Sequence, residues 1–168
     1  MIKHRKTNRD TFTEQFRQQE ADLYRMAYVY VKNEQDALDV MQEAAYRAYK
    51  NYHTLQNPQY FKTWVTRIVI NCAIDCIRKN KEVLPLEDYA ENLPVLSHSE
   101  EQQIILSATL QQLMDILSPQ EKSVILLKYY EQYTFRDISQ ILGLPEGTVK
   151  SLLYRALHKL RTAAKEEL

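Results

Sequence analysis

The sequence predicts an all-α protein in which two small helical domains are joined by a flexible acidic linker. Its 168 residues include only two glycines and five prolines, so the chain has little of the turn chemistry that a β-sheet requires. Apolar residues instead recur every three or four positions over long stretches, which is typical of amphipathic helices. A chain of this length forms one ordinary domain or two small ones, and a break in the pattern after residue 80 favours two.

Charge and cysteine content limit what the chain can bind and where it works. The 22 basic and 22 acidic residues cancel, so binding to nucleic acid or to an anionic membrane must be local. Two cysteines, no N-terminal apolar segment and no apolar run of membrane-spanning length indicate a soluble cytoplasmic protein. Residues 1–10 are basic, and we expect them to form a disordered tail.

We predict that residues 11–80 form the first domain, with three helical segments. Residues 12–31 read as one helix or two short ones, and a second helix spans about 34–52. A third helix begins at Pro58 and ends near residue 79. The residues expected to face the core from the second and third helices are Ala37, Met41, Ala44, Ala45, Ala48, Tyr52, Phe61, Val65, Ile68, Cys72 and Cys76.

The second predicted helix carries an acidic stripe. Asp36, Asp39 and Glu43 lie at positions i, i+3 and i+7, which places them on one face. Acids near the start of a helix, with Arg47 and Lys50 near its end, also complement the helix dipole. From composition alone, this structural interpretation is favoured over a binding surface.

The third predicted helix interleaves aromatic and basic side chains. Residues 58–82 contain five bases and two acids, a charge of +3. This combination suits single-stranded nucleic acid, because an unstacked base can lie on a ring while its phosphate meets a cation. A tryptophan at helical spacing is more often a core residue, so the residues alone leave the two interpretations evenly balanced. The side chains concerned are Tyr60, Lys62, Trp64, Arg67, Asn71, Arg78 and Lys79.

Cys72 and Cys76 lie one helical turn apart, but the four histidines are scattered over separate segments, so a zinc site lacks its remaining ligands. We interpret both cysteines as small apolar core residues. The sequence contains no glycine-rich phosphate loop, no nucleophile elbow and no histidine-rich metal motif. We therefore expect no enzyme activity, no metal, no cofactor and no small-molecule substrate.

Residues 81–99 break the helical periodicity and form the predicted linker. From Glu82 to Glu121 the chain has eight acids and no lysine or arginine, a charge of −8. An acidic segment punctuated by prolines favours a flexible tether, or an interacting strand where a basic channel receives it.

Residues 100–168 are predicted to form a four-helix domain that ends in a helix-turn-helix. Residues 118–121 give its second helix a capping box, with proline at the first helical position. Gly143 can take the left-handed backbone that ends a helix, and Pro145 suits the first turn of the next one. The leucines expected in the core of the first of these helices are Leu106, Leu110, Leu113 and Leu117.

The last helix has a basic outer face. Residues 147–165 contain five bases and no acid, a charge of +5, in a chain of zero net charge. The alternative without a binding role is an ordinary helical hairpin whose basic face is solvated. One-sided charge in a helix-turn-helix favours DNA binding instead. The outward residues are Thr148, Lys150, Ser151, Tyr154, Arg155, His158 and Lys159.

Taken together, three stretches resemble the extracytoplasmic-function (ECF) bacterial RNA polymerase sigma factors, group four of the sigma-70 superfamily. They cover residues 23–52, residues 61–79 (FKTWVTRIVINCAIDCIRK) and residues 117–161. In that family the first domain binds the polymerase clamp and opens the minus-ten element, and the second reads the minus-thirty-five element. The resemblance implies an alternative sigma factor that directs promoter recognition, DNA opening and transcription initiation in a stress or envelope response.

The resemblance also implies partners and site residues. The partners are core RNA polymerase, promoter DNA and an anti-sigma factor, often membrane-anchored, which would hold the protein at the membrane. The polymerase-binding positions are Asp36, Asp39, Gln42 and Glu43. The minus-ten positions are Phe61, Trp64, Arg67, Asn71, Asp75 and Arg78, to which the basic pattern adds Lys62. The minus-thirty-five positions are Lys150, Ser151, Tyr154 and Arg155, to which the outward face of the last helix adds Thr148 and Lys159.

The chain departs from the family at four positions. Ala44 and Ala45 stand where larger apolar residues are frequent, and Ile70 and Cys76 stand where bases are common, which implies a less cationic minus-ten face. The competing function is a stand-alone helix-turn-helix regulator whose first domain senses a ligand or dimerises, and which binds a palindromic operator by itself. A helical enzyme would need a pocket of perturbed carboxylates.

Overall fold

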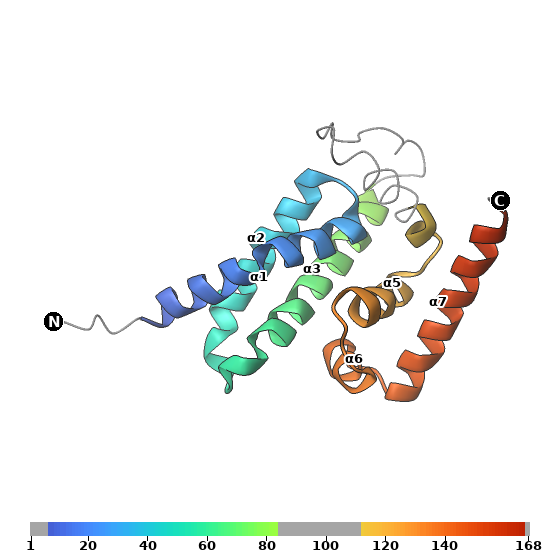
Figure 1. Cartoon of the computed structure of the whole chain (residues 1–168). Coiled ribbons are helices and arrows are strands. Elements are labelled where there is room, and N and C mark those ends of the chain that lie inside the picture. The colour runs from blue at the N-terminus through green and yellow to red at the C-terminus, as the bar shows by residue number, and fades with distance from the viewer. Residues whose placement is uncertain (1–6, 84–111, 167–168) are drawn as a thin grey trace, which may run out of the picture. The chain divides into compact units, whose positions relative to one another are not determined.

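The computed structural model describes residues 7–83 and 112–166, and within these ranges every regular element is helical (Figure 1). The chain divides into two compact units, Met1–Pro85 and Leu86–Leu168. The prediction of an all-α fold with two helical domains is therefore confirmed. The predicted linker lies outside the described residues apart from its first three positions, 81–83, which are the last residues of a helix.

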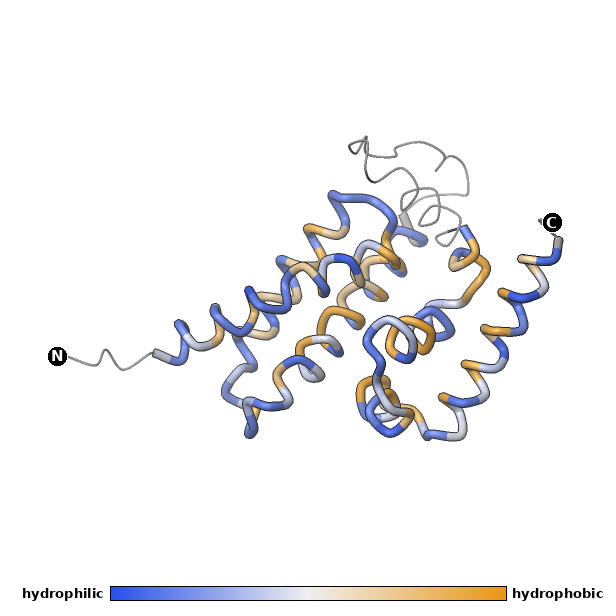
Figure 2. The backbone as a smooth tube through the Cα atoms, in the orientation of Figure 1, coloured by the Kyte–Doolittle hydropathy of each residue, from blue (hydrophilic) through white to orange (hydrophobic). Residues whose placement is uncertain are grey.

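The first unit is a bundle of three helices, α1 (Asn8–Val31), α2 (Glu34–Asn51) and α3 (Phe61–Val83), each of which packs against the other two. Two short 3₁₀ turns, η1 (Tyr52–Thr54) and η2 (Pro58–Tyr60), lie between α2 and α3. Figure 2 shows hydrophobic and hydrophilic residues alternating along each of these helices, as amphipathic packing requires.

The α1 helix starts earlier than the sequence pattern predicted. The Asp10 amide donates to the Thr7 hydroxyl at 3.2 Å, and the Thr7 amide donates to the Asp10 carboxylate at 3.1 Å. This reciprocal capping box satisfies two N–H groups that a helix end leaves unpaired. Residues 8–10 are therefore helical rather than part of a disordered tail, and residues 1–6 lie outside the described part of the chain.

Three alanines of α2, Ala37, Ala44 and Ala48, are completely buried and let the neighbouring helices approach closely. The predicted core needs correction at four positions, since Ala45, Tyr52, Ile68 and Cys76 are only half-buried. The α3 helix contacts both α1 and α2, so its buried face is wider than one helical stripe. The buried residues that the single stripe missed are Val40, Thr66, Val69, Ile70 and Ala73.

The second unit contains α5 (Pro119–Ile125), a five-residue π-helix η3 (Leu126–Tyr130), α6 (Phe135–Leu142) and α7 (Glu146–Glu166). Residues 112–115 are also helical. The long α7 helix packs against α5 and α6 and supplies core residues including Val149, Leu153 and Ala156. Of the predicted first-helix leucines, Leu117 is buried and Leu113 half-buried, and Leu106 and Leu110 lie outside the described residues.

The helix-turn-helix is formed by α6 and α7. Thr134 and Asp137 make a capping box at the start of α6, and Gly143 ends it with φ of +64°, as predicted. Pro145 lies one residue before α7, where its carbonyl accepts the Val149 amide at 3.0 Å. The proline is thus the N-cap residue, directly before the first turn for which the sequence pattern suited it.

Candidate functional site

Three of the four predicted polymerase-binding positions on α2 are exposed. Asp39, Gln42 and Glu43 face solvent. The Asp39 carboxylate accepts a 3.2 Å hydrogen bond from Nε2 of the Gln35 side chain. Asp36 differs, because its Oδ2 accepts from Asn33 at 2.8 Å and from Asn80 of α3 at 3.0 Å. Asn33 is the N-cap of α2, and the Asp36 carboxylate holds the Asn33 side chain and joins α2 to α3. Only part of the Asp36 carboxylate is accessible to a partner.

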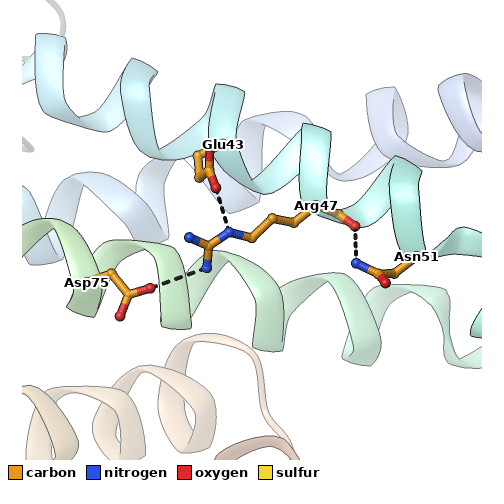
Figure 3. A network of polar contacts seen from close by, with 4 residues as sticks. All are labelled: Glu43, Arg47, Asn51 and Asp75. Carbon is orange, nitrogen blue, oxygen red and sulfur yellow. Dashed lines mark hydrogen bonds and ion pairs between the residues drawn. The ribbon is translucent and has the colours of Figure 1, made fainter.

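A second tie between α2 and α3 involves two of the predicted site residues. Arg47 donates through Nε to Oε1 of Glu43 at 2.6 Å and through Nη1 to Oδ2 of Asp75 at 3.2 Å (Figure 3). The Glu43 hydrogen bond raises the pKa of the Arg47 guanidinium, so the cation is held firmly in its charged form. Arg47 joins the predicted polymerase face to the predicted minus-ten helix, a link that the sequence reading missed.

The predicted minus-ten residues of α3 separate into exposed, partly exposed and buried groups. Arg67, Asn71 and Arg78 are exposed, and Lys62, Trp64 and Asp75 are partly exposed. Phe61 is only 4% exposed, so it is a core residue and its ring has no free face for a base. This burial disfavours a direct contact between Phe61 and DNA.

Phe61, the first residue of α3, belongs to an aromatic cluster that includes Phe12 of α1. The Phe61 ring centroid lies 5.9 Å from those of Phe12 and Trp64 and 6.1 Å from that of Tyr52. The cluster supports Trp64 from behind, which leaves the indole half-exposed at the edge. The exposed aromatic residues of the same unit are Tyr46, Tyr49 and Tyr60.

Two positions at which the chain departs from the family pattern have structural explanations. Ile70 is 2% exposed, so it belongs to the core and not to the DNA-facing side where bases were expected. Cys76 is half-buried, and burial, followed by the nearby Asp36 and Asp39 carboxylates, raises its thiol pKa. Burial likewise raises the pKa of the Cys72 thiol. Both thiols therefore resist ionisation, and this disfavours a redox role.

The outer face of α7 presents the predicted minus-thirty-five residues. Thr148, Lys150, Ser151 and Arg155 are exposed, and Tyr154 is 69% exposed although it is aromatic. A large ring left in solvent beside cations is typical of a nucleic-acid surface. The small residues lie within the first two turns of the helix, where backbone N–H groups and the helix dipole favour a phosphate.

Phe135 at the start of α6 holds two cations near this surface. The Nζ of Lys128 lies 4.6 Å from its ring centroid and the Nζ of Lys150 lies 5.5 Å from it. Cation–π contacts of this kind limit where a lysine amino group can point. Neither Lys128 nor Phe135 was predicted, because the sequence pattern offers no signal for contacts between residues so far apart.

Lys159 is engaged within its own unit. Its Nζ lies 2.8 Å from Oε2 of Glu121, a carboxylate that is 2% exposed and also accepts the Ser118 amide at 2.9 Å. Lys159 was predicted as a DNA contact on the outer face, but the structure gives its amino group an intramolecular partner. In the part of the chain that the structure describes, no three histidine, cysteine or acidic side chains are grouped closely enough to hold a metal ion.

Family models match both units. The model described as Sigma-70 region 2 matches residues 16–83, and the model described as Sigma-70, region 4 matches residues 107–160. A three-helix unit of the first kind, followed by a helix-turn-helix unit of the second, defines a sigma-70 type transcription factor, which is a DNA-binding regulator. Within the described helices, none combines the length and the apolar content that crossing a bilayer demands.

The chain is 36% identical to the RNA polymerase sigma factor SigV of Bacillus subtilis, over 87% of this chain and 86% of that one. It is 34% identical to the ECF sigma factor SigW of the same organism, over 83% and 81%. It is 32% identical to the sigma-E factor of Streptomyces coelicolor, over 89% and 84%. The chain therefore belongs to the ECF family of RNA polymerase sigma factors, and is an alternative sigma factor that directs transcription initiation.

Solved structures share the fold. The sigma factor RpoE of Bartonella quintana, crystallised with the anti-sigma factor NepR, matches with a TM-score of 0.72 at 19% identity, over 92% of this chain and 97% of that one. CnrH, in complex with the cytosolic domain of CnrY, matches with a TM-score of 0.71 at 19% identity, over 96% and 92%.

Proposed function

We propose that the two units divide the work of promoter recognition between them, with residues 11–80 acting as sigma region two and residues 100–168 as region four. The α2 acids bind core RNA polymerase, α3 opens and holds the minus-ten element, and α7 reads the minus-thirty-five element in the major groove. This extends the family assignment to particular side chains and partners.

The observation that carries the proposal is the separation of charge between exposed faces. Asp39 and Glu43 form an acidic surface on α2, whereas α7 presents cations and no acid between residues 147 and 165. An acidic face repels DNA phosphates and suits a basic protein partner. A basic recognition helix attracts DNA phosphates and repels a basic protein surface. The two faces therefore serve two different partners.

For the polymerase face we assign Asp39, Gln42 and Glu43, with Asp36 contributing mainly by holding the N-cap residue Asn33 and Asn80 of α3. For the minus-ten element we assign Lys62, Trp64, Arg67, Asn71, Asp75 and Arg78, the side chains that α3 leaves at least partly exposed. A flipped non-template base would stack on an exposed ring edge while the cations hold its backbone, which offsets the few kcal/mol that unstacking costs. For the minus-thirty-five element we assign Thr148, Lys150, Ser151, Tyr154 and Arg155.

A partner that covers the polymerase face would switch the protein off. The matching RpoE structure contains the anti-sigma factor NepR, and the matching CnrH structure contains the cytosolic domain of CnrY. By analogy we propose that this sigma factor has an anti-sigma partner, often membrane-anchored in this family, and that it acts in the cytoplasm in a stress or envelope response.

The proposal predicts that the free chain holds promoter DNA weakly. Its net charge is zero, and its two DNA-binding faces lie on separate units that only the polymerase aligns. Gel shifts on promoter DNA, with and without core polymerase and over a series of salt concentrations, test this. We expect that only the holoenzyme binds promoter DNA tightly and that this binding weakens as the salt concentration rises. Equal affinity with and without the core enzyme contradicts the proposal and favours a stand-alone regulator.

A further inference from the structure

Arg47 bonds an acid on its own helix, α2, and an acid on α3. Its guanidinium contacts Glu43 at 2.6 Å on its own helix and Asp75 at 3.2 Å on the neighbouring helix (Figure 3). Its backbone carbonyl accepts the side-chain amide of Asn51 at 2.8 Å. All three side chains of the ion-pair network are partly solvent-exposed, and ion pairs of that kind contribute little to folding stability. A purely stabilising role therefore explains little of this arrangement.

Asp75 is the one acid between residues 61 and 81 of the sequence, and it lies on a helix whose exposed side chains include Arg67, Asn71 and Arg78. An isolated carboxylate there would repel DNA phosphates. A carboxylate whose position is fixed can instead accept a hydrogen bond from the exocyclic amino group of an unpaired base. Arg47 bonds Oδ2, and a fixed Oδ2 restricts where the second oxygen, Oδ1, can point.

We infer that Arg47 is a positioning residue that orients the Asp75 carboxylate for recognition of one minus-ten base, and thereby links the polymerase-facing helix to base discrimination. The inference rests on the proposed function, because it assumes that α3 meets the opened minus-ten strand. Glu43 bonds the same guanidinium, so the orientation of Asp75 depends on the helix that docks on the polymerase. An arginine suits this task, since its planar fork can bond two carboxylates in fixed directions where a lysine cannot.

The test uses holoenzyme assembled from the full chain and core polymerase, with a promoter set in which each minus-ten base pair is replaced in turn. Opening is read from permanganate reactivity of unpaired thymines, and core affinity is measured separately. The wild-type holoenzyme must first open the parent promoter; if it does not, the proposed function fails before the inference is tested.

We expect Arg47→Ala to lower opening about fivefold or more while core affinity stays within about twofold. Asp75→Ala should lose discrimination at a single base position, Arg47→Ala should lose it at the same position, and the double variant should be no worse than Asp75→Ala alone. A merely structural role for Arg47 would not select one base.

Asn80→Ala is the matched control. Asn80 makes another hydrogen bond between α3 and α2, to Asp36 at 3.0 Å, so its loss loosens the same pair of helices without touching Asp75. We expect this variant to keep wild-type base discrimination. Three outcomes would each overturn the inference. The first is additive losses in the Arg47 and Asp75 double variant, and the second is a loss of base discrimination in Asn80→Ala. The third is a loss of core affinity large enough to explain the whole defect of Arg47→Ala.

Discussion

Lys159 of α7 and Glu121 of α5 form an ion pair with 2.8 Å between Nζ and Oε2, and the glutamate is almost completely buried. The same carboxylate caps α5 through the Ser118 amide, so one side chain fixes both the start of α5 and the position of the recognition helix. We expect Lys159→Ala to destabilise the second unit by about 1–3 kcal/mol, because a buried acceptor loses its charged donor. Lys165→Ala, an exposed lysine of the same helix, is the control.

This ion pair also gives a pH dependence. Burial alone would raise the pKa of Glu121, but the Lys159 hydrogen bond and the Ser118 amide outweigh it and hold the pKa below its ordinary value of 4.5. A lowered carboxyl pKa contributes stability that is present above 4.5 and is lost as the pH falls through the folded value. The difference between wild type and Lys159→Ala should therefore shrink in acid. Amide hydrogen exchange in α5 measures this stability difference. Tryptophan fluorescence would not report it, because the single tryptophan, Trp64, lies in the other unit. An unchanged difference at pH 3 would contradict the assignment.

Arg155→Ala should weaken promoter use without weakening polymerase binding. Arg155 is exposed on the basic face of α7, and loss of one base or phosphate contact costs about 1–3 kcal/mol in DNA affinity. Filter binding by holoenzyme over a salt series, beside core affinity, makes the measurement. If the contact is to a phosphate, the salt slope should fall by about one. Lys165→Ala again serves as the control, and an equal effect of both variants would argue against a specific role for Arg155.

Asp39→Lys should have the opposite profile. Asp39 lies on the exposed acidic face of α2, and reversing its charge opposes a basic polymerase surface, so we expect core affinity to fall about tenfold or more. Glu20→Lys makes the same charge change on an exposed position of α1. Competition for labelled core enzyme compares the two. If Glu20→Lys weakens binding as much as Asp39→Lys, net charge rather than the α2 face governs docking.

The thiols of Cys72 and Cys76 should react slowly at neutral pH. Burial raises both thiol pKa values above the ordinary 9.0, and Asp36 and Asp39 add to the effect at Cys76. Alkylation by iodoacetamide, followed by mass spectrometry across pH, should show rates that are low at pH 7, rise steadily with the thiolate fraction and have not levelled off by pH 9. Glutathione provides the reference thiol. Rapid modification of either cysteine at pH 7 would instead indicate a sensor.

Local signals in the sequence predicted much of the fold. The capping box at Ser118 and the left-handed Gly143 depend on residues a few positions apart, and both were predicted. The capping box of Thr7 with Asp10 is equally local but lies in a charged segment, where composition suggested a disordered tail. The π-helix at Leu126–Tyr130 has no comparable local signature.

The site was less predictable, because its geometry depends on contacts across helices. Arg47 and Asp75 are 28 positions apart, and Glu121 and Lys159 are 38 positions apart, so no helical spacing relates either pair. The position of Phe61 within a family motif predicted a contact with minus-ten DNA. In the structure, aromatic rings from α1 and from the turn between α2 and α3 bury the Phe61 side chain. Ile70 is buried because two helices pack on α3, which a one-stripe pattern cannot indicate.

The most direct test of the whole account is transcription from genomic DNA by purified core polymerase with and without this protein, followed by mapping of the transcript start points. We expect start points that appear only when the protein is present and that share an upstream motif in two parts, spaced for one unit at minus ten and one at minus thirty-five. A protein that adds no start points, fails to bind core polymerase and binds a palindromic operator by itself would contradict the account.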